Sequence, residues 1–215
     1  MEVVRFRQEL RRSAFTLMEL LVVMAIIAIL LVAIVPAVTS LSKSSGRKAA
    51  MNNLMGAIDQ ARSLAIKDGE STYVAFADRL PKGSSTNLSD RYSYRSYAIF
   101  EDDAANPGSL KQIVAWRTLP VGISFRSGSL GYLAKTKAFP FTPGGAGVTS
   151  SFPFLQFTAN GEIDPACTPS AVTGTVQIAV FEGFVDPKNG ERDTNASKPT
   201  ETVAVNRLTG RPERM

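Results

Sequence analysis

The sequence predicts an α+β protein in which a long N-terminal helix packs on an antiparallel β-sheet domain. Three observations support this fold class. One long apolar run, residues 20–38, lies near the start of the chain. A helical pattern of apolar residues continues to about residue 69, and only strand-like segments follow it. A helix followed by strands alone is typical of an α+β architecture, in which the helix covers one face of the sheet.

The composition narrows the classes of function. The chain has 215 residues, a net charge of +5, one cysteine (Cys167) and no histidine. A single cysteine excludes an internal disulfide, and the lack of histidine excludes Ser-His-Asp and Cys-His nucleophile arrangements and histidine-based zinc sites. The acidic loop 186–195 does not have EF-hand spacing, and no phosphate-binding glycine loop is present in the sequence. We therefore predict no enzyme activity, no cofactor and no metal site.

The first fourteen residues form a basic leader. Arg5, Arg7, Arg11 and Arg12 outnumber the two glutamates of this segment. Positive charge before an apolar run holds that side of a membrane protein in the cytoplasm. We expect residues 15–38 to form a single helix across the inner membrane, because a helix of this length rises about 36 Å and the hydrocarbon core is about 30 Å thick. The remainder of the chain is then extracytoplasmic.

One carboxylate, Glu19, lies just inside the apolar run, where burying an ionised group in lipid costs about 2–3 kcal/mol. The surrounding sequence S-A-F-T-L-M-E-L-L resembles the processing signal of type IV pilins and type II secretion pseudopilins. This resemblance implies that prepilin peptidase cuts between Ala14 and Phe15 and that the new amino group of Phe15 is methylated. Ala14 stands where the family usually has glycine.

The resemblance also implies a role for Glu19 in filament assembly. After cleavage, Glu19 of one subunit can pair with the Phe15 ammonium of a neighbour, so that each charge offsets the cost of burying the other. The alternative is that Glu19 lies at the membrane surface and reaches the lipid headgroups. On hydropathy alone, the segment is a simple uncleaved anchor.

Residues 39–69 are expected to form an extracytoplasmic continuation of the helix. Gly69 is placed to cap its end, whereas Pro36 and Gly46 mark points where a bend or fraying is expected. Apolar residues that recur at helical spacing on one face are Leu54, Ile58, Ala61 and Ala65.

Residues 70–215 are predicted to form the antiparallel sheet domain, because seven segments are rich in aromatic and β-branched residues. In the segment 175–181, valine and isoleucine alternate with polar or small residues, as in a strand with one buried face. The segments 159–162 and 187–190 are predicted turns, and the glycine-rich segment 143–150 is a predicted mobile loop. The predicted strands are 71–77, 92–100, 112–118, 121–125, 153–157, 175–181 and 201–205.

Three segments of the chain resemble the H-type minor pseudopilins and FimT-like proteins. Residues 54–76 resemble the helix end and first strand of that family, residues 155–161 resemble a strand and turn, and residues 205–211 resemble the closing strand. We interpret Arg62 as a helix residue that faces solvent or bridges to the sheet, and not as a catalytic residue. The matching residues at the helix end are Ala61, Arg62, Ala65, Ile66 and Gly69.

The sequence therefore favours a minor pilin or pseudopilin, a structural subunit of a type II secretion pseudopilus or a type IV pilus. The expected partners are prepilin peptidase/methyltransferase, other pilins or pseudopilins, and the inner membrane. The alternative is a FimT-like pilin that binds DNA for uptake through a basic tail formed by Arg207, Arg211 and Arg214. Glu213 interrupts this tail, and three arginines make few phosphate contacts, so such binding would be weak and salt-dependent.

Overall fold

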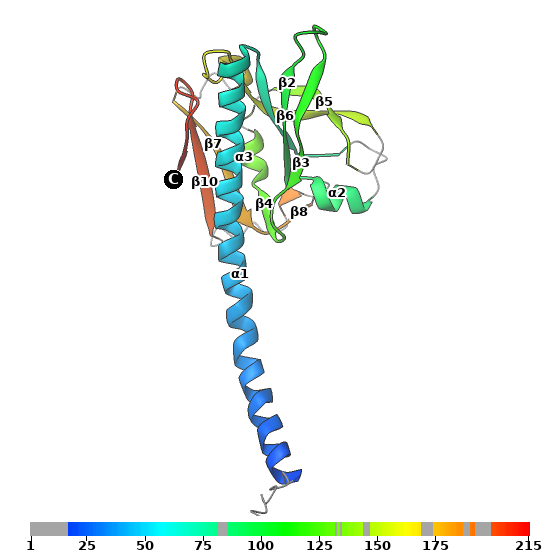
Figure 1. The fold of residues 1–215 in the computed structure, drawn as a ribbon, viewed down its shortest axis with the longest axis vertical. Helices are drawn as coiled ribbons and strands as arrows, with labels where there is room; N and C mark the ends of the chain where they lie inside the picture. The colour runs from blue at the N-terminus through cyan, green and yellow to red at the C-terminus, as the bar shows by residue number, and fades with distance from the viewer. Residues whose placement is uncertain are drawn as a thin grey trace, which may run out of the picture. The chain divides into compact units, whose positions relative to one another are not determined.

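A long helix, α1 (Leu17–Asp68), begins the described part of the chain (Figure 1). The computed structural model describes residues 17–80, 86–131, 133, 135–143, 147–168, 174–186, 190–191 and 199–215. The chain divides into two compact units, Met1–Ser42 and Lys43–Met215, and α1 contributes to both. The predicted basic leader, with Ala14 and Phe15, lies outside the described residues.

The first part of α1 is apolar. Its large side chains from Leu17 to Leu31 are exposed, and Leu17 is 81% exposed. Among the residues that the structure describes, no helix is long and apolar enough to cross a membrane. The predicted membrane segment 15–38 lies partly outside this set, since residues 15 and 16 and the side chains of residues 32–38 are not described.

The second part of α1 has one buried face, which includes all four apolar residues predicted from the helical spacing. The helix is continuous through Gly46, where a Cβ atom would lie 3.7 Å from Pro120 Cβ. It ends as predicted at Gly69, which has a φ of 73° and donates its amide to the Ala65 carbonyl at 3.1 Å. The buried residues of this face are Ala50, Met51, Leu54, Ala57, Ile58, Ala61 and Ala65.

The strands form two antiparallel sheets and a short ribbon, whereas the sequence predicts a single sheet. The five-stranded sheet has the order β3-β2-β1-β6-β5, and the four-stranded sheet has the order β11-β10-β7-β4. The five-stranded sheet contains β1 (Thr72–Ala77), β2 (Ser96–Asp102), β3 (Leu110–Thr118), β5 (Thr136–Phe141) and β6 (Val148–Phe157). The four-stranded sheet contains β4 (Ile123–Phe125), β7 (Thr175–Glu182), β10 (Thr200–Asn206) and β11 (Pro212–Arg214), and the ribbon pairs β8 (Val185–Asp186) with β9 (Gly190–Glu191).

The five-stranded sheet is covered on both faces. Phe76 lies on one face, where its ring packs against Phe125 of β4 with centroids 5.4 Å apart, whereas Tyr73 lies on the opposite face in an aromatic cluster. The sheet curls over this cluster, and Trp116 Nε1 of β3 donates to the Pro140 carbonyl of β5 at 3.0 Å. Ring centroids in the cluster lie 5.0 to 6.0 Å apart. Its members are Tyr73, Phe100, Trp116, Phe139, Phe141, Phe152 and Phe154.

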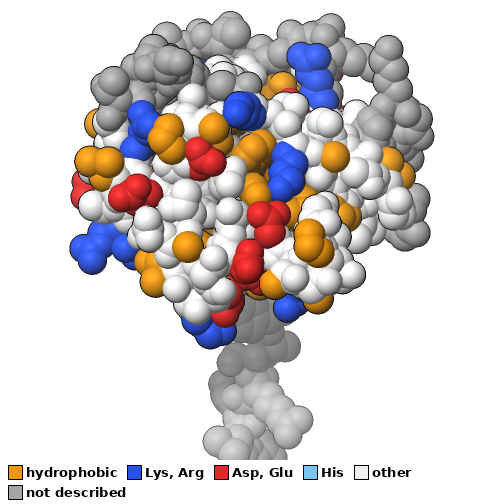
Figure 2. Space-filling model, turned by 90° about the horizontal axis from the view of Figure 1, so that it is seen from above, with side chains coloured by type: hydrophobic (Ala, Val, Ile, Leu, Met, Phe, Trp, Pro, Cys, Tyr) orange, Lys and Arg blue, Asp and Glu red, His pale blue; other side chains and the backbone are white. Residues whose placement is uncertain are grey.

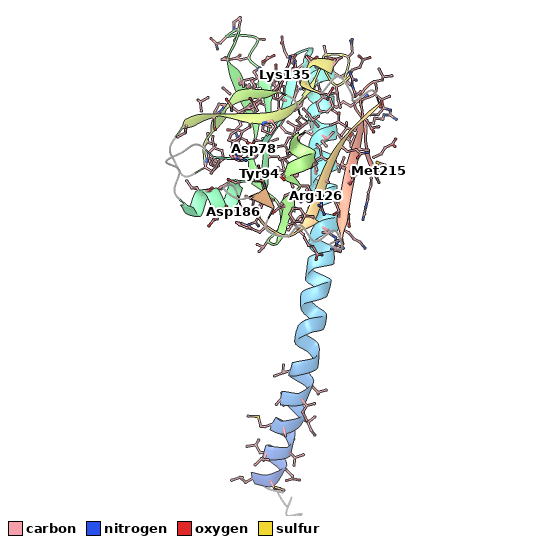
Figure 3. All side chains as sticks on the ribbon, turned by 180° about the vertical axis from the view of Figure 1, so that it is seen from behind. Asp78, Tyr94, Arg126, Lys135, Asp186 and Met215 are labelled. Atoms are coloured by element: carbon pink, nitrogen blue, oxygen red, sulfur yellow. The ribbon has the colours of Figure 1, made fainter. Side chains whose placement is uncertain are left out.

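Backbone hydrogen bonds at β4 form the seam between the two sheets. The Phe125 amide donates to the Tyr94 carbonyl and the Arg126 amide donates to the Ala179 carbonyl, both at 2.8 Å. Tyr94 and Arg126 are marked in Figure 3. Tyr94 has a φ of 55°, in the left-handed region, and so turns the chain sharply before β2.

Helices that the sequence does not predict follow α1. They are α2 (Thr86–Tyr92), α3 (Ser127–Gly131) and a 3-10 turn (Pro165–Cys167). The prediction of a strand from residue 92 is wrong at its start, because α2 ends at Tyr92 and the left-handed Tyr94 interrupts the extended backbone. The strand begins at Ser96.

The loop predictions have mixed outcomes. The mobile loop predicted at 143–150 is wrong for residues 148–150, which begin β6, and residues 144–146 lie outside the described set. The turn predicted at 159–162 is confirmed, since the Thr158 amide donates to the Glu162 carbonyl at 2.9 Å and Gly161 has a φ of 77°. Of the turn predicted at 187–190, residues 187–189 are not described.

Candidate functional site

Glu19 lies in the first turn of α1, among exposed apolar side chains such as Leu17, Leu20 and Leu21. A helix N-terminus favours a negative charge, because the first amide groups of the helix have no acceptor within it. The apolar surface around Glu19 can be covered by another apolar helix. Such a contact would bury the carboxylate and require a positive partner.

Arg62 joins the end of α1 to two turns that are distant in sequence. Its Nε atom donates to the Thr209 carbonyl oxygen at 2.6 Å. Gly161 and Gly210 lie against it, and a Cβ atom on Gly210 would overlap the Gly161 carbonyl oxygen and lie 3.0 Å from Arg62 Cδ. The three segments that carry the family resemblance thus meet at one point. The interpretation of Arg62 as a bridge from helix to sheet domain is confirmed.

A second polar link joins α1 to the four-stranded sheet. Arg47 forms an ion pair with Glu182 of β7, and its Nε lies 3.5 Å from Glu201 of β10. Arg214 Nη2 of β11 lies 2.8 Å from the other carboxylate oxygen of Glu201. Alternating charges therefore run from β7 through α1 and β10 to β11. Sequence reasoning missed this link, because Arg47 and Glu182 are separated by 135 positions and no local pattern pairs them.

The arginines of the predicted DNA-binding tail are in three different environments. Arg214 pairs with Glu201, Arg207 is half-buried, and Arg211 is exposed. Glu213 is exposed in the same short strand as Arg214. The positive charge of the tail is therefore partly neutralised, and DNA binding by these residues stays a prediction.

Acidic side chains gather where α1 ends beside the β2–β3 hairpin. They line a groove of about 300 Å³, and Figure 2 shows acidic side chains on this face. Glu101 is the most buried of them at 7% exposed, and its Oε1 has no hydrogen-bond partner among the described residues. Burial and the neighbouring Asp68 carboxylate raise the pKa of Glu101 above its usual range. The groove is lined by Asp68, Glu70, Glu101, Asp102, Asp103, Ala104, Ala105 and Lys111.

The substitution Glu101→Gln should stabilise the folded protein at neutral pH. A carboxyl group with a raised pKa binds its proton more tightly in the folded chain than in the unfolded chain. This proton binding stabilises the folded state fully below the unfolded pKa, and the stabilisation is lost as the pH rises through the folded pKa. We expect the free energy of unfolding to increase by about 1 kcal/mol at pH 7, because a poorly satisfied buried charge is removed, and to change little near pH 4.

Urea denaturation at both pH values measures this difference. Glu162→Gln is the matched control, because Glu162 is exposed and the same charge is removed. A loss of stability at pH 7 in the Glu101 variant, with no loss in the control, would contradict the expectation.

The described residues give no indication of metal or thiol chemistry. Within them, no three histidine, cysteine, aspartate or glutamate side chains are grouped to hold a metal ion. Cys167 is buried, its Sγ donates to the Asp164 carbonyl at 3.0 Å, and burial raises the pKa of the thiol, so a reactive thiolate is disfavoured. In the acidic loop 186–195, Asn189 and Asp193 lie outside the described residues.

Comparison with known proteins gives a family match near the start of the sequence. Residues 10–35 match the family model of the prokaryotic N-terminal methylation motif. No curated protein matches the chain. Among solved structures, the chain is similar to the minor pseudopilin EpsH from the type 2 secretion system of Vibrio cholerae, with 10% identity and a TM-score of 0.39 over 78% of this chain and 94% of that chain. Ala14, Phe15 and Glu19 all lie within the residues that match the N-terminal methylation motif.

Proposed function

We propose that the chain is a minor pilin or pseudopilin, a structural subunit of a type II secretion pseudopilus or a type IV pilus. The observation that carries the proposal is the methylation motif at residues 10–35, with Glu19 inside an apolar helix. The α+β unit that follows supports a subunit whose apolar helix packs inside a filament and whose sheets face outward. In this role the chain needs no active site.

The proposal places each part of the chain in a compartment. Residues 1–14 are cytoplasmic and removed, residues 15–38 cross the inner membrane, and the unit Lys43–Met215 is extracytoplasmic. The partners are then the prepilin peptidase/methyltransferase, which acts on Phe15, and other pilins or pseudopilins, which pack against the apolar helix.

The contacts of α1 would transmit a force on the helix to the sheets, as expected for a subunit that is pulled by its helix. Arg47 and Arg62 bind the two ends of the buried helix segment to the sheets, and the apolar face between them is buried. A force applied to the helix would therefore reach the whole unit Lys43–Met215. This is the mechanical property that extraction of a subunit from a membrane requires.

The intact mass of the processed protein tests the proposal, because cleavage after Ala14 changes it. When the full chain is produced with an active prepilin peptidase, intact mass should show loss of residues 1–14 and addition of one methyl group at Phe15. Ala14→Gly should be cut at least as fast, because the family usually has glycine there. A chain that keeps residues 1–14 beside an active peptidase would contradict the proposal, and an inactive peptidase is the control.

We do not propose DNA uptake as a second function. The observation against it is the pairing of Arg214 with Glu201, together with the half-buried position of Arg207. Arg211 alone contributes too little charge for a phosphate-binding surface.

A further inference from the structure

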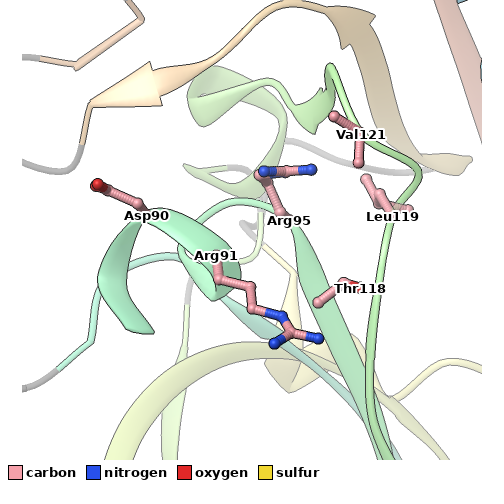
Figure 4. Close-up of a pocket in the computed structure, with 6 residues that line it drawn as sticks. All are labelled: Asp90, Arg91, Arg95, Thr118, Leu119 and Val121. Atoms are coloured by element: carbon pink, nitrogen blue, oxygen red, sulfur yellow. The ribbon is translucent and has the colours of Figure 1, made fainter. Parts of the chain in front are cut away.

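Two arginines line a pocket between α2 and the turn that joins β3 to β4 (Figure 4). The pocket has a volume of about 530 Å³. The Arg91 and Arg95 side chains extend toward the segment 118–121, whereas the Asp90 carboxylate points away from them. The lining residues are Asp90, Arg91, Arg95, Thr118, Leu119 and Val121.

Arg95 has bonding capacity that the described residues do not use. Its Nη2 makes a long hydrogen bond of 3.4 Å to the Pro120 carbonyl, and its buried Nε has no partner in the part of the chain that the structure describes. Burial lowers the pKa of this guanidinium, and no described carboxylate compensates for that burial. A guanidinium presents five N–H donors in a fork that matches the oxygens of a phosphate, so an anion in the pocket would satisfy it.

An apolar side chain projects beside the two arginines. Val121 is 92% exposed and lies in a tight turn, in which the Ile123 amide donates to the Pro120 carbonyl at 3.1 Å. Gly122, at the third position of this turn, has a φ of 82°, which glycine adopts without strain. The turn thus holds Val121 outward. An exposed apolar group next to basic groups is the combination that enters the interface of an anionic bilayer.

The unit that carries this turn begins at Lys43, five residues after Val38, the last residue of the predicted membrane segment. Anchoring through that segment would keep the unit at a membrane surface. Anionic lipid headgroups are then the most abundant phosphates within its reach.

We propose that Arg91 and Arg95 bind the phosphate of an anionic phospholipid headgroup while Val121 enters the lipid interface. This inference rests on the proposed membrane anchoring of the chain. The contact would hold the unit Lys43–Met215 on the membrane surface until the subunit is extracted into a filament. The chemistry of the pocket is shared by any phosphate, and the membrane is the source that the position of Val121 favours.

Vesicle co-sedimentation of residues 43–215 tests the proposal. This fragment is one of the two compact units and contains all of the buried core cluster. We expect it to bind vesicles of phosphatidylcholine and phosphatidylglycerol, and to bind pure phosphatidylcholine vesicles much more weakly. Changing both arginines to glutamine should lower the partition coefficient about 30-fold, because each basic residue at an anionic surface contributes about a fivefold factor.

Two further variants separate the pocket from general charge and from folding. Lys135→Gln with Arg211→Gln removes the same charge from exposed residues that do not line the pocket, and should reduce binding far less. Arg95→Lys keeps the charge and should retain part of the binding. Circular dichroism confirms that each variant is folded.

Three results would overturn the proposal. They are equal binding to both kinds of vesicle, an equal loss in the control double variant, or complete displacement by inorganic phosphate at constant ionic strength, which would indicate a site for a free anion. The fragment lacks the apolar anchor, so this outcome is independent of the mass test on the full chain. A processed full chain with a fragment that ignores vesicles would refute only this inference.

Discussion

A chain that carries Glu19→Leu should reach the membrane at the normal level and fail to enter filaments. In the proposed assembly, the carboxylate pairs with the ammonium group of Phe15 on a neighbouring subunit. Removing one partner of a buried ion pair leaves the other charge uncompensated and costs about 3–5 kcal/mol. We therefore expect incorporation to fall about 100-fold or more, measured as the fraction of the protein in sheared filaments.

Two variants serve as controls for this experiment. Glu19→Gln keeps the size and polarity of the side chain and should also fail, because the negative charge is the feature required. Leu20→Ala changes an adjacent exposed apolar residue and should still assemble. Normal incorporation of Glu19→Leu would refute the pairing and would leave Glu19 as a residue that reaches the lipid headgroups.

Gly210→Ala should have the largest effect on stability, a loss of about 3 kcal/mol or more. Gly210 has a φ of 64°, which costs a residue with a side chain about 1–2 kcal/mol. A Cβ atom there would also overlap the Gly161 carbonyl oxygen and press on Arg62 Cδ, and a backbone atom cannot yield as a flexible side chain can. The hydrogen bond from Arg62 to Thr209 would be displaced as well.

Gly108→Ala is the matched control. Gly108 also has a positive φ, 91°, but a Cβ atom there would meet no other atom within 4 Å. Gly108→Ala should lower the free energy of unfolding by only about 1–2 kcal/mol, because alanine disfavours a positive φ. Urea denaturation of both variants measures the difference, and an equal loss in the two would show that the contact between the turns contributes nothing.

The parts of the fold that the sequence predicts are those with a strong local pattern. The buried face of α1, its end at Gly69 and the alternation in β7 follow from helical and strand periodicity, which any long segment with one buried face must show. The methylation motif is likewise a continuous stretch of sequence, and its match covers residues 10–35.

The elements that the sequence did not reveal have weak local patterns. β5 and β11 each contain a proline, Pro140 and Pro212, which argues against a strand unless the strand lies at a sheet edge. Both strands are edge strands, so the proline is tolerated, but the edge position is known only from the topology. The short helix α2 has too few residues for a clear period.

The contacts that position the sites depend on long separations in sequence. Arg62 and Thr209 are 147 positions apart, and no pattern within either segment indicates that they meet. The pocket of Arg91 and Arg95 likewise needs the turn at Val121, which only the packing of β4 brings close. Sequence reasoning identified the correct segments around Arg62, but it could not place them together.

The order of synthesis affects how α1 is covered. Its partners Glu182, Glu201 and Thr209 are made long after the helix itself, and β1 pairs with β6 only after some eighty intervening residues have emerged. During synthesis, the apolar face of α1 therefore lacks part of its cover until β10 has emerged. Premature termination before β10 would leave that face only partly covered, so quality-control proteases should recognise truncated chains even when the predicted leader and anchor are intact.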